Sequence, residues 1–288
     1  MVKRTGIFFT YFQGERLKDF PQALDGILDE ENVSYYDAVY ESRQGLYYLE
    51  PLSEELLLKV HSQSMVQRVK LTGDYESALY SAGGTVQAAE RISQGQLDNA
   101  FVFTSFGDHH AGRDFYGGMC YFNGAALAIT ALRDRGVRRV VIVDTDCHHA
   151  DGTRDIFNHD KDVLHICFCN QDYSDKYNNV DIRIPYHTSD EEYLDRVTQE
   201  LFSRVIAFET EYIFWEFGYD ATKGEYGDKG LTMDCHPRLA AIIKAVADKV
   251  CQGRMVTILC GGSGRAVATY TIPRIIDCLA ELGNYRTI

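Results

Sequence analysis

The sequence has few of the features that mark secreted, membrane-spanning or nucleic-acid-binding proteins. Its 288 residues include no apolar run long enough to cross a bilayer, and the apolar stretch near the N-terminus is too short for a signal peptide. Lys and Arg form no block and the formal net charge is −13, which argues against nucleic-acid binding through a basic patch. We therefore expect neither a membrane nor a nucleic acid as a partner. Cationic substrates, such as polyamines or lysine side chains, suit an acidic chain.

The cysteines lack the spacing of a disulfide framework. Eight are scattered along the chain with no Cys-x-x-C pair, and Cys167 and Cys169 lie two positions apart in a strand-like run. This usage is typical of reduced thiols in the cytosol. The sequence therefore predicts a cytoplasmic protein.

The chain also lacks linkers rich in Pro, Gly or Ser, low-complexity tracts and repeats of fixed period. Its hydrophobic fraction of 45% is normal for a globular protein, and its length suits one large α/β domain. We predict a single domain over residues 1–288, with a mostly parallel sheet and helices on both faces, because strands alternate with helices throughout. The predicted strands are 6–9, 99–104, 140–143, 163–169, 181–184, 212–217 and 255–259, with a further short strand within 38–48. The predicted helices are 21–28, 75–92, 117–135, 189 to about 210, 236–251 and 271–282, with others opening at Ser53 and Thr153.

The most informative stretch is 140–153, which reads Val-Val-Ile-Val-Asp-Thr-Asp-Cys-His-His-Ala-Asp-Gly-Thr. Its first four residues are apolar without polar alternation, as in a central strand buried on both faces. Asp144, Asp146 and His148 follow at intervals of two, so in an extended chain they would project to the same side. Carboxylates and an imidazole at the end of a buried strand predict half of a metal site. An ordinary loop with Asp151 as a helix N-cap explains one Asp, but not three Asp and two His within eight residues.

Three other loops follow predicted strands. His109 and His110 follow one strand, Asp220 follows another, and a Gly-rich turn at 261–264 follows a third. In an open α/β sheet, such loops meet at the edge where ligands bind. The turn lacks the Lys-Ser/Thr ending of a P-loop, so it is either a different phosphate loop or a tight turn that lies close to a site.

Asp146, His148 and Asp220 would supply two oxygens and one nitrogen to a metal ion. A catalytic zinc typically has three protein ligands and an open position for water. Water bound there has its pKa lowered toward neutrality and can attack a carbonyl.

His109 and His110 are the candidates for moving protons in such a reaction. One histidine can take the proton of the water and protonate the leaving amine. Asp144 and Asp151 are then free to orient the two imidazoles and to influence their charge. The competing interpretation is an ordinary pair of loop histidines without a catalytic role. The nearby aspartates argue against that interpretation.

Taken in order, these residues resemble the histone deacetylase superfamily, which includes acetylpolyamine amidohydrolases and acetoin-utilisation proteins. The run Asp-x-Asp-x-His-His-x-Asp-Gly-Thr from Asp144 to Thr153 is similar to the metal-binding motif of that family. The other similar segments, in the same order as in the family, are Ser53-Glu54-Glu55-Leu56-Leu57 with Val60-His61, His109-His110-Ala111, Gly118-Met119-Cys120-Tyr121-Phe122-Asn123, Gly218-Tyr219-Asp220 and Gly261-Gly262-Ser263-Gly264.

The resemblance implies a single arginase-like α/β domain with a central, mostly parallel eight-stranded sheet. It implies Zn²⁺, or alternatively Fe²⁺, bound by Asp146, His148 and Asp220, and it allows a structural K⁺ held by backbone carbonyls near the strand that carries the first two ligands. It further implies a general base and acid pair with an aspartate partner for each histidine, and substrate contacts from the glycine-containing loops. The residues concerned are His109 with Asp144, His110 with Asp151, and Gly118, Met119, Gly262 and Gly264.

The chain departs from the family pattern at the end of the glycine turn. Deacetylases have a tyrosine there, whose hydroxyl polarises the substrate carbonyl, and this chain has Arg265. Arg265 is interpreted in one of three ways: it stabilises the developing oxyanion, it binds a substrate carboxylate through a bidentate pair, or it points away into an ion pair while Tyr270 or water serves instead. Met119 also replaces the phenylalanine that commonly lines the acyl-lysine tunnel.

The function predicted from the sequence is a zinc-dependent amidohydrolase that cleaves an acyl-amide bond in a small-molecule or acyl-lysine-like substrate. One alternative is a non-catalytic homologue that binds metal and an acylated ligand. The other is a binuclear hydrolase of the arginase type. The oligomeric state is not predicted.

Overall fold

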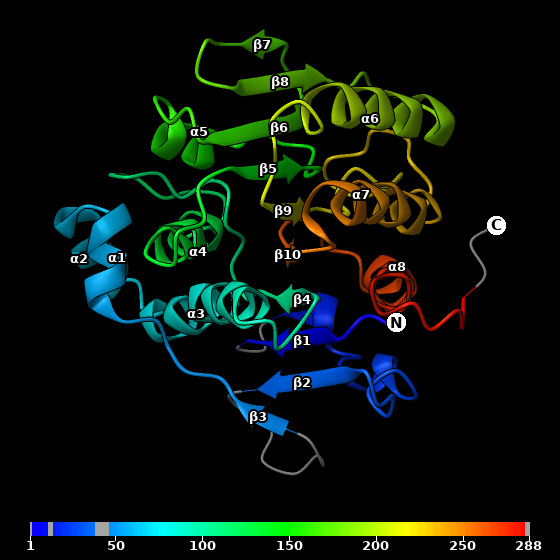
Figure 1. The fold of residues 1–288 in the computed structure, drawn as a ribbon, viewed down its shortest axis with the longest axis horizontal. Helices are drawn as coiled ribbons and strands as arrows, with labels where there is room; N and C mark the ends of the chain where they lie inside the picture. The colour runs from blue at the N-terminus through cyan, green and yellow to red at the C-terminus, as the bar shows by residue number, and fades with distance from the viewer. Residues whose placement is uncertain (1, 11–13, 38–45, 286–288) are drawn as a thin grey trace.

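The computed structural model describes residues 2–10, 14–37 and 46–285, and within these ranges one wide sheet forms the centre of the protein (Figure 1). Its ten strands run in the order β3-β2-β1-β4-β10-β9-β5-β6-β8-β7. All neighbouring strands pair in parallel except β7 and β8, which are antiparallel. The strands are β1 (Thr5–Phe9), β2 (Val33–Asp37), β3 (Leu46–Tyr48), β4 (Asn99–Phe103), β5 (Val140–Asp144), β6 (Val163–Cys169), β7 (Tyr173–Ser174), β8 (Asn179–Arg183), β9 (Tyr212–Phe217) and β10 (Met255–Leu259).

The predicted mostly parallel sheet is confirmed, with a difference in the number of strands. Eight strands have five to seven residues, and the short strands β3 and β7 add one strand at each edge. The strand β2 was not predicted from the sequence, and of the strand predicted within 38–48 only β3 lies among the described residues.

Helices cover both faces of this sheet, as predicted (Figure 1). One face carries the first five helices and the other carries the last three, so each face has its own hydrophobic cluster. The helices are α1 (Glu54–Val60), α2 (Gln63–Lys70), α3 (Tyr75–Ser93), α4 (Gly124–Arg133), α5 (Asp151–Phe157), α6 (Asp190–Arg204), α7 (Cys235–Cys251) and α8 (Arg265–Ala280), with the 3-10 turns Glu15–Leu17 and Gln22–Leu24 before β2. Every described helix falls short of the length or apolarity that a membrane crossing requires.

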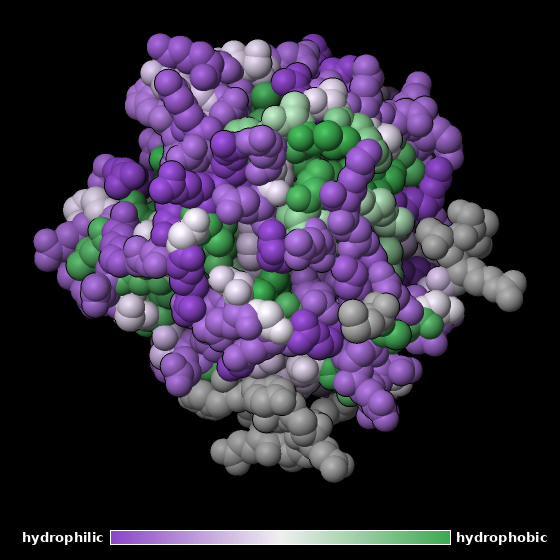
Figure 2. All heavy atoms as spheres, viewed as in Figure 1, coloured by the Kyte–Doolittle hydropathy of each residue, from purple (hydrophilic) through white to green (hydrophobic). Residues whose placement is uncertain are grey.

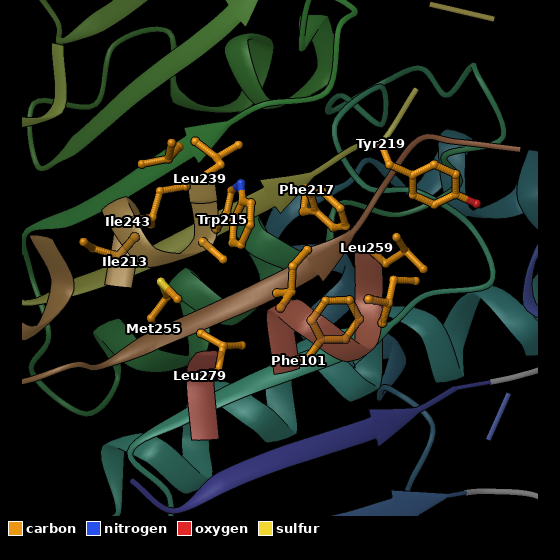
Figure 3. Close-up of a cluster of buried hydrophobic side chains, with 14 of the residues drawn as sticks. Phe101, Ile213, Trp215, Phe217, Tyr219, Leu239, Ile243, Met255, Leu259 and Leu279 are labelled. Carbon is orange, nitrogen blue, oxygen red and sulfur yellow. The ribbon is translucent and has the colours of Figure 1, made fainter. Parts of the chain in front are cut away.

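The side chains of each central strand alternate between the two clusters. On β9, Ile213, Trp215 and Phe217 pack toward α7 and α8 (Figure 3). Tyr212 and Phe214 belong to the hydrophobic cluster on the opposite face, with residues of α3 and α4. This is why the central strands read as continuous apolar runs: a parallel strand between two helical layers is buried on both sides. Trp215 also links the core to the loop after β5, because its indole nitrogen donates to Thr145 Oγ1 over 2.8 Å.

The surface facing the viewer in Figure 1 is mostly hydrophilic, with apolar side chains showing only in areas between polar ones (Figure 2). This agrees with the excess of acidic residues in the sequence.

Three helix predictions need correction. The last helix, predicted at 271–282, begins six residues earlier, at Arg265, and ends at Ala280. The segment predicted as a helix at 21–28 forms only a 3-10 turn, Gln22–Leu24, followed by further turns. The alanine-rich helix predicted at 117–135 begins only at Gly124, because Asn123 is its N-cap and accepts from the backbone N–H of Ala126. Residues 117–123 are instead a loop that borders the site described below.

The double glycine inside α3, Gly83-Gly84, allows close packing. A Cβ on Gly83 would lie 2.7 Å from the carbonyl oxygen of Glu50, and one on Gly84 would lie 2.7 Å from Thr10 Cγ2. The gain in packing offsets the low helix propensity of glycine.

Candidate active site

Four strands that are neighbours in the sheet end at the same place. The sheet order places β4, β10, β9 and β5 side by side, and the loops that follow them carry all the polar groups singled out in the sequence. Because the strands are parallel, these loops emerge at one edge of the sheet and converge.

Asp146, His148 and Asp220 meet at this edge. His148 Nδ1 lies 2.8 Å from Asp146 Oδ1 and 2.9 Å from Asp220 Oδ2. The three residues do not come together by extension of the strand, because β5 ends at Asp144, whose side chain accepts from the backbone N–H of Asp146 over 2.9 Å. A turn, rather than the alternation expected from an extended chain, aims Asp146 and His148 at the same point.

Glycines allow the backbone to approach these three side chains closely. A Cβ on Gly261 would lie 2.2 Å from Asp146 Oδ2, and one on Gly218 would lie 2.7 Å from the same atom. Gly261 instead donates its N–H to Asp146 Oδ2 over 2.8 Å. Of the two roles considered for the glycine turn, close approach of backbone to a site therefore describes it.

The charges of this group suit a bound cation. Asp146 and Asp220 are both buried, and burial together with the charge of Asp146 raises the pKa of Asp220. Hydrogen bonds to Asp146 and Asp220 raise the pKa of His148 to about 12, so without a metal a proton is held between the carboxylates. A divalent cation would satisfy the same three donors, and the set of two carboxylates and one imidazole fits zinc or iron(II). The Sγ of Cys147 lies close by, 3.0 Å from Asp220 Oδ2.

His109 and Asp144 form a buried pair. His109 Nδ1 lies 2.7 Å from Asp144 Oδ2, and His109 Nε2 lies 3.7 Å from Asp146 Oδ1, so the imidazole bridges the aspartate and the edge of the ligand group. Behind Asp144 stands Glu216 of β9, which shares a hydrogen bond with it. Burial and the charge of Asp144 raise the pKa of Glu216 well above its ordinary value, which favours a protonated Glu216 that donates to Asp144.

His110 and Asp151 form the second pair, nearer to solvent. His110 Nδ1 lies 2.6 Å from Asp151 Oδ1, and the hydrogen bond to His110 lowers the pKa of Asp151 despite its partial burial. Asp151 is the first residue of α5 and Ala150 is the N-cap, so the alternative interpretation of Asp151 as an N-cap residue is wrong. The two pairs are those expected from the sequence.

Buried polar residues outside the site hold the histidine loop in place. His61, at the C-cap of α1, lies 2.8 Å from the carbonyl oxygen of Gly112 and accepts from the N–H of Asn123 over 3.1 Å. Gly152 of α5 packs against the backbone of Ala111, where a Cβ would lie only 2.4 Å from the carbonyl carbon. His61 is therefore a structural support of the histidine loop.

A cavity of about 670 Å³ opens onto the two histidines and the ligand group. Gly118, Met119 and Gly262 line it, as expected for substrate contacts, but Gly264 does not. Met119 has a positive φ of 63° and is 65% exposed, which places it at the rim.

Arg265 lies outside this cavity. Its guanidinium forms an ion pair with Asp19 at the surface, which matches the third of the three interpretations considered for it. Tyr270 does not take its place, because its hydroxyl hydrogen-bonds Asp234 and lines a different cavity with Arg274. The residues of the glycine turn that line the cavity are Gly261, Gly262 and Ser263.

A different tyrosine reaches the cavity, from the loop after β9. The hydroxyl of Tyr226 accepts from the N–H of Gly262 over 2.8 Å, and its ring stacks on His148 with centroids 5.6 Å apart. Burial raises the pKa of Tyr226, which keeps the hydroxyl protonated. The neighbouring Glu225 fixes the turn by accepting from the N–H of Ser263 and of Gly264.

Sequence reasoning did not identify Tyr226, Glu225 or Glu216 as site residues. Glu216 could have been identified from the sequence, because it is a charged residue in the middle of an apolar strand. A charged side chain is buried in such a place only when it has partners. Tyr226 and Glu225 lie in a polar loop whose course is set by contacts with the glycine turn, and no local pattern in the sequence predicts those contacts.

Comparison with known proteins gives a consistent result. Residues 30–277 match the histone deacetylase domain family. A probable deacetylase of Archaeoglobus fulgidus is 27% identical over 314 aligned positions, which cover 96% of this chain and 86% of that protein. Acetylpolyamine amidohydrolase 1 of Pseudomonas aeruginosa is 37% identical over a shorter stretch, which covers 40% of this chain and 33% of that protein.

Among solved structures, the HDA15 HD domain superposes with a TM-score of 0.80 at 22% identity and covers 97% of this chain and 88% of its own. The fold matches along nearly the whole chain, and the family match spans the strands that carry the site. The chain therefore belongs to the histone deacetylase family and is a hydrolase of the deacetylase type.

Proposed function

We propose that this protein is a zinc-dependent amidohydrolase that cleaves an acyl-amide bond in a small acylated amine or an acyl-lysine-like substrate. The observation that carries the proposal is the arrangement of two His–Asp pairs beside one Asp-His-Asp group in a single cavity. A protein that only bound an acylated ligand would have no use for both proton-transfer pairs.

Asp146, His148 and Asp220 would hold the metal, which supplies Lewis-acid chemistry and lowers the pKa of water when bound. Hydrolysis requires that one proton leave the attacking water and one reach the departing nitrogen. His109 and His110 lie on the cavity wall and are the groups positioned to carry these protons. Asp144 and Asp151 fix the ring orientations and stabilise each imidazolium as it forms.

The oxyanion of the transition state needs a donor that the family supplies from the glycine turn. We assign this role to Tyr226. Its hydroxyl oxygen accepts from Gly262, which leaves its own proton to donate into the cavity. A Cβ built on Gly261 would lie 2.8 Å from Tyr226 Oη and 2.2 Å from Asp146 Oδ2, so both atoms border one small volume. A preorganised donor aimed at a developing oxyanion is worth roughly 3–4 kcal/mol.

The substrate class follows from charge. Arg265 would favour a carboxylated substrate only if it faced the cavity, and its ion pair with Asp19 turns it away. The net charge of −13 instead suits an acylated amine whose remainder is cationic, such as an acetylpolyamine. The name of the Pseudomonas aeruginosa relative, an acetylpolyamine amidohydrolase, supports this choice. Fe²⁺ in place of Zn²⁺ and a structural K⁺ remain predictions from the family.

The test uses the zinc-loaded protein and its Asp220→Ala variant with a panel of amides. The panel contains an acetylpolyamine, an acetyl-lysine peptide and N-acyl amino acids with free carboxylates. We expect wild-type turnover of the cationic amides. The variant should lose turnover and the ion held by Asp146, His148 and Asp220, while its circular dichroism spectrum stays native. Metal retained at full occupancy in the variant would refute the ligand assignment. No turnover by zinc-loaded wild type on any member would favour the non-catalytic homologue.

A further inference from the structure

A second group of metal-binding side chains lies on the other side of the loop after β5. It consists of His149, Cys167, Cys169 and Asp181, and one ligand atom from each lies within 4.8 Å of the others. Cys167 and Cys169 are two apart on β6 and so project to the same face, and Asp181 comes from the paired strand β8. The sequence analysis singled out the two cysteines only as reduced thiols.

The two consecutive histidines of the loop face different groups. His148 points to Asp146 and Asp220, whereas His149 Nδ1 lies 3.4 Å from Asp181 Oδ2 and 4.0 Å from Cys169 Sγ. The second group therefore shares no residue with the proposed catalytic one and is not explained by the proposed reaction.

The spacing within the second group suits a metal ion better than hydrogen bonds. The contacts of His149 to Asp181 and to Cys169, at 3.4 and 4.0 Å, are long for hydrogen bonds. A tetrahedral zinc with bonds of roughly 2.0–2.3 Å separates its ligand atoms by roughly 3.3–3.8 Å. The separations from His149, 3.4 Å to Asp181 and 4.0 Å to Cys169, lie in or near that range, and all four ligand atoms lie within 4.8 Å of one another.

The surrounding charge also fits a divalent cation. A zinc ion with two thiolates, one carboxylate and a neutral imidazole leaves one net negative charge. Arg154 lies against the group, with its guanidinium 2.5 Å from Asp181 Oδ1, and would balance that charge. The cysteines and Asp181 are buried, while the side chain of His149 is 26% exposed, so an ion could enter past the imidazole.

We propose that His149, Cys167, Cys169 and Asp181 form a second, structural site for zinc or another thiophilic divalent cation. All four coordination positions are filled by protein, which is the pattern of structural rather than catalytic zinc. The ion would tie the loop that carries His148 to β6 and β8. This inference does not depend on the proposed hydrolysis.

The test is metal content together with a spectroscopic signature of thiolate ligation. We expect the purified, zinc-equilibrated protein to retain two zinc ions per chain after dialysis, and Cys169→Ser to retain one. Asp220→Ala should also retain one, but lose the other ion. With Co²⁺ in place of zinc, the wild type should show a near-ultraviolet thiolate-to-cobalt charge-transfer band that Asp220→Ala keeps and Cys169→Ser loses.

Two variants control for other sources of these signals. Cys251→Ser removes a buried thiol of α7 that bonds only to backbone carbonyls of its own region, so it should keep both ions and the band. Cys147→Ser removes the thiol beside Asp220 and should keep the band as well. If Cys169→Ser fails to fold, Cys167→Ser and the cobalt spectrum of the wild type carry the test.

A single zinc per chain in the wild type would overturn the proposal. So would a second zinc that survives both Cys167→Ser and Cys169→Ser, since that result would instead point to a binuclear catalytic centre. Absence of turnover on every amide would leave the two-zinc result intact, and so would bear on the proposed function alone.

Discussion

At the scale of single residues, the two histidines of the site differ in their access to solvent. The side chain of His109 is 3% exposed and that of its partner Asp144 is fully buried, whereas His110 and Asp151 are 22% and 52% exposed. The buried pair can keep a fixed orientation and tautomer, and the exposed pair can exchange protons with water. This difference in exposure suits catalysis, because the two histidines must return to their starting protonation states in each cycle.

Replacement of Asp144 by Asn should lower kcat/KM by about 10²–10⁴-fold, because the amide cannot stabilise an imidazolium on His109. Zinc content should not change, since Asp144 lies behind the ligands. Steady-state kinetics and metal analysis of the purified variant give both values. Asp160→Asn, which breaks an exposed ion pair with Arg133, is the matched control and should have wild-type kinetics.

Tyr226→Phe tests the oxyanion donor. The variant should lose about 10²–10³-fold in kcat with little change in KM, because the hydroxyl acts on the transition state rather than on the bound amide. Tyr270→Phe removes a hydroxyl bonded to Asp234, away from the cavity, and should behave as the wild type. Equal kcat values for the two variants would assign the oxyanion to another group.

At the scale of elements, the loop that carries His109 and His110 depends on α1. His61 is buried between Gly112 and Asn123, and burial lowers its pKa from 6.5 to about 4. The folded protein therefore keeps His61 neutral at pH values where the unfolded chain binds a proton to it. The resulting contribution to stability is complete above pH 6.5 and is lost as the pH falls toward 4.

His61→Gln isolates this effect, because the amide can make both hydrogen bonds but does not titrate. The free energy of unfolding of the wild type should fall by about 2 kcal/mol relative to the variant between pH 7 and pH 5. Urea titrations of both proteins at the two pH values give the difference. A difference that is independent of pH would mean that His61 binds a proton as readily in the folded protein as in the unfolded chain.

The elements also show what the sequence could and could not predict. Strands such as β5 and β9 were found because burial on both faces leaves a continuous apolar run that is local in the chain. The beginning of α4 was misplaced by joining residues 117–123 to the alanine-rich run that follows, although Gly117, Gly118 and Asn123 are poor helix formers. The contacts of Asn123 with His61 and Thr153 hold this segment as a loop. Tyr226 enters the cavity for a similar reason, since its position depends on a contact with Gly262.

The same distinction between local patterns and distant contacts applies to the site residues. The pairings of His109 with Asp144 and of His110 with Asp151 were predictable because the family motif fixes which side chains meet. The direction of Arg265 was not, since a partner distant in sequence, Asp19, decides it.

At the scale of the whole molecule, metal should contribute to the stability of the fold. Asp146 and Asp220 are buried carboxylates whose repulsion a divalent cation removes. At a free zinc concentration 100-fold above Kd, the ion should stabilise the protein by about 2.7 kcal/mol. Thermal melts with zinc and with a chelator should therefore differ by several degrees in Tm, and Asp220→Ala should show a smaller difference. Identical melts would show that the folded chain holds no metal.

The directions of His148 and His149 have a consequence for how this loop can vary. His148 faces Asp146 and Asp220, His149 faces Asp181, and Asp151 returns to His110. Inserting one residue before His148 would place its imidazole beside Asp181, and deleting one would place the imidazole of His149 beside Asp146 and Asp220. Either change would leave one carboxylate group without its imidazole. Related chains should therefore accept many changes of residue type around these positions before they accept a change in the length of the loop.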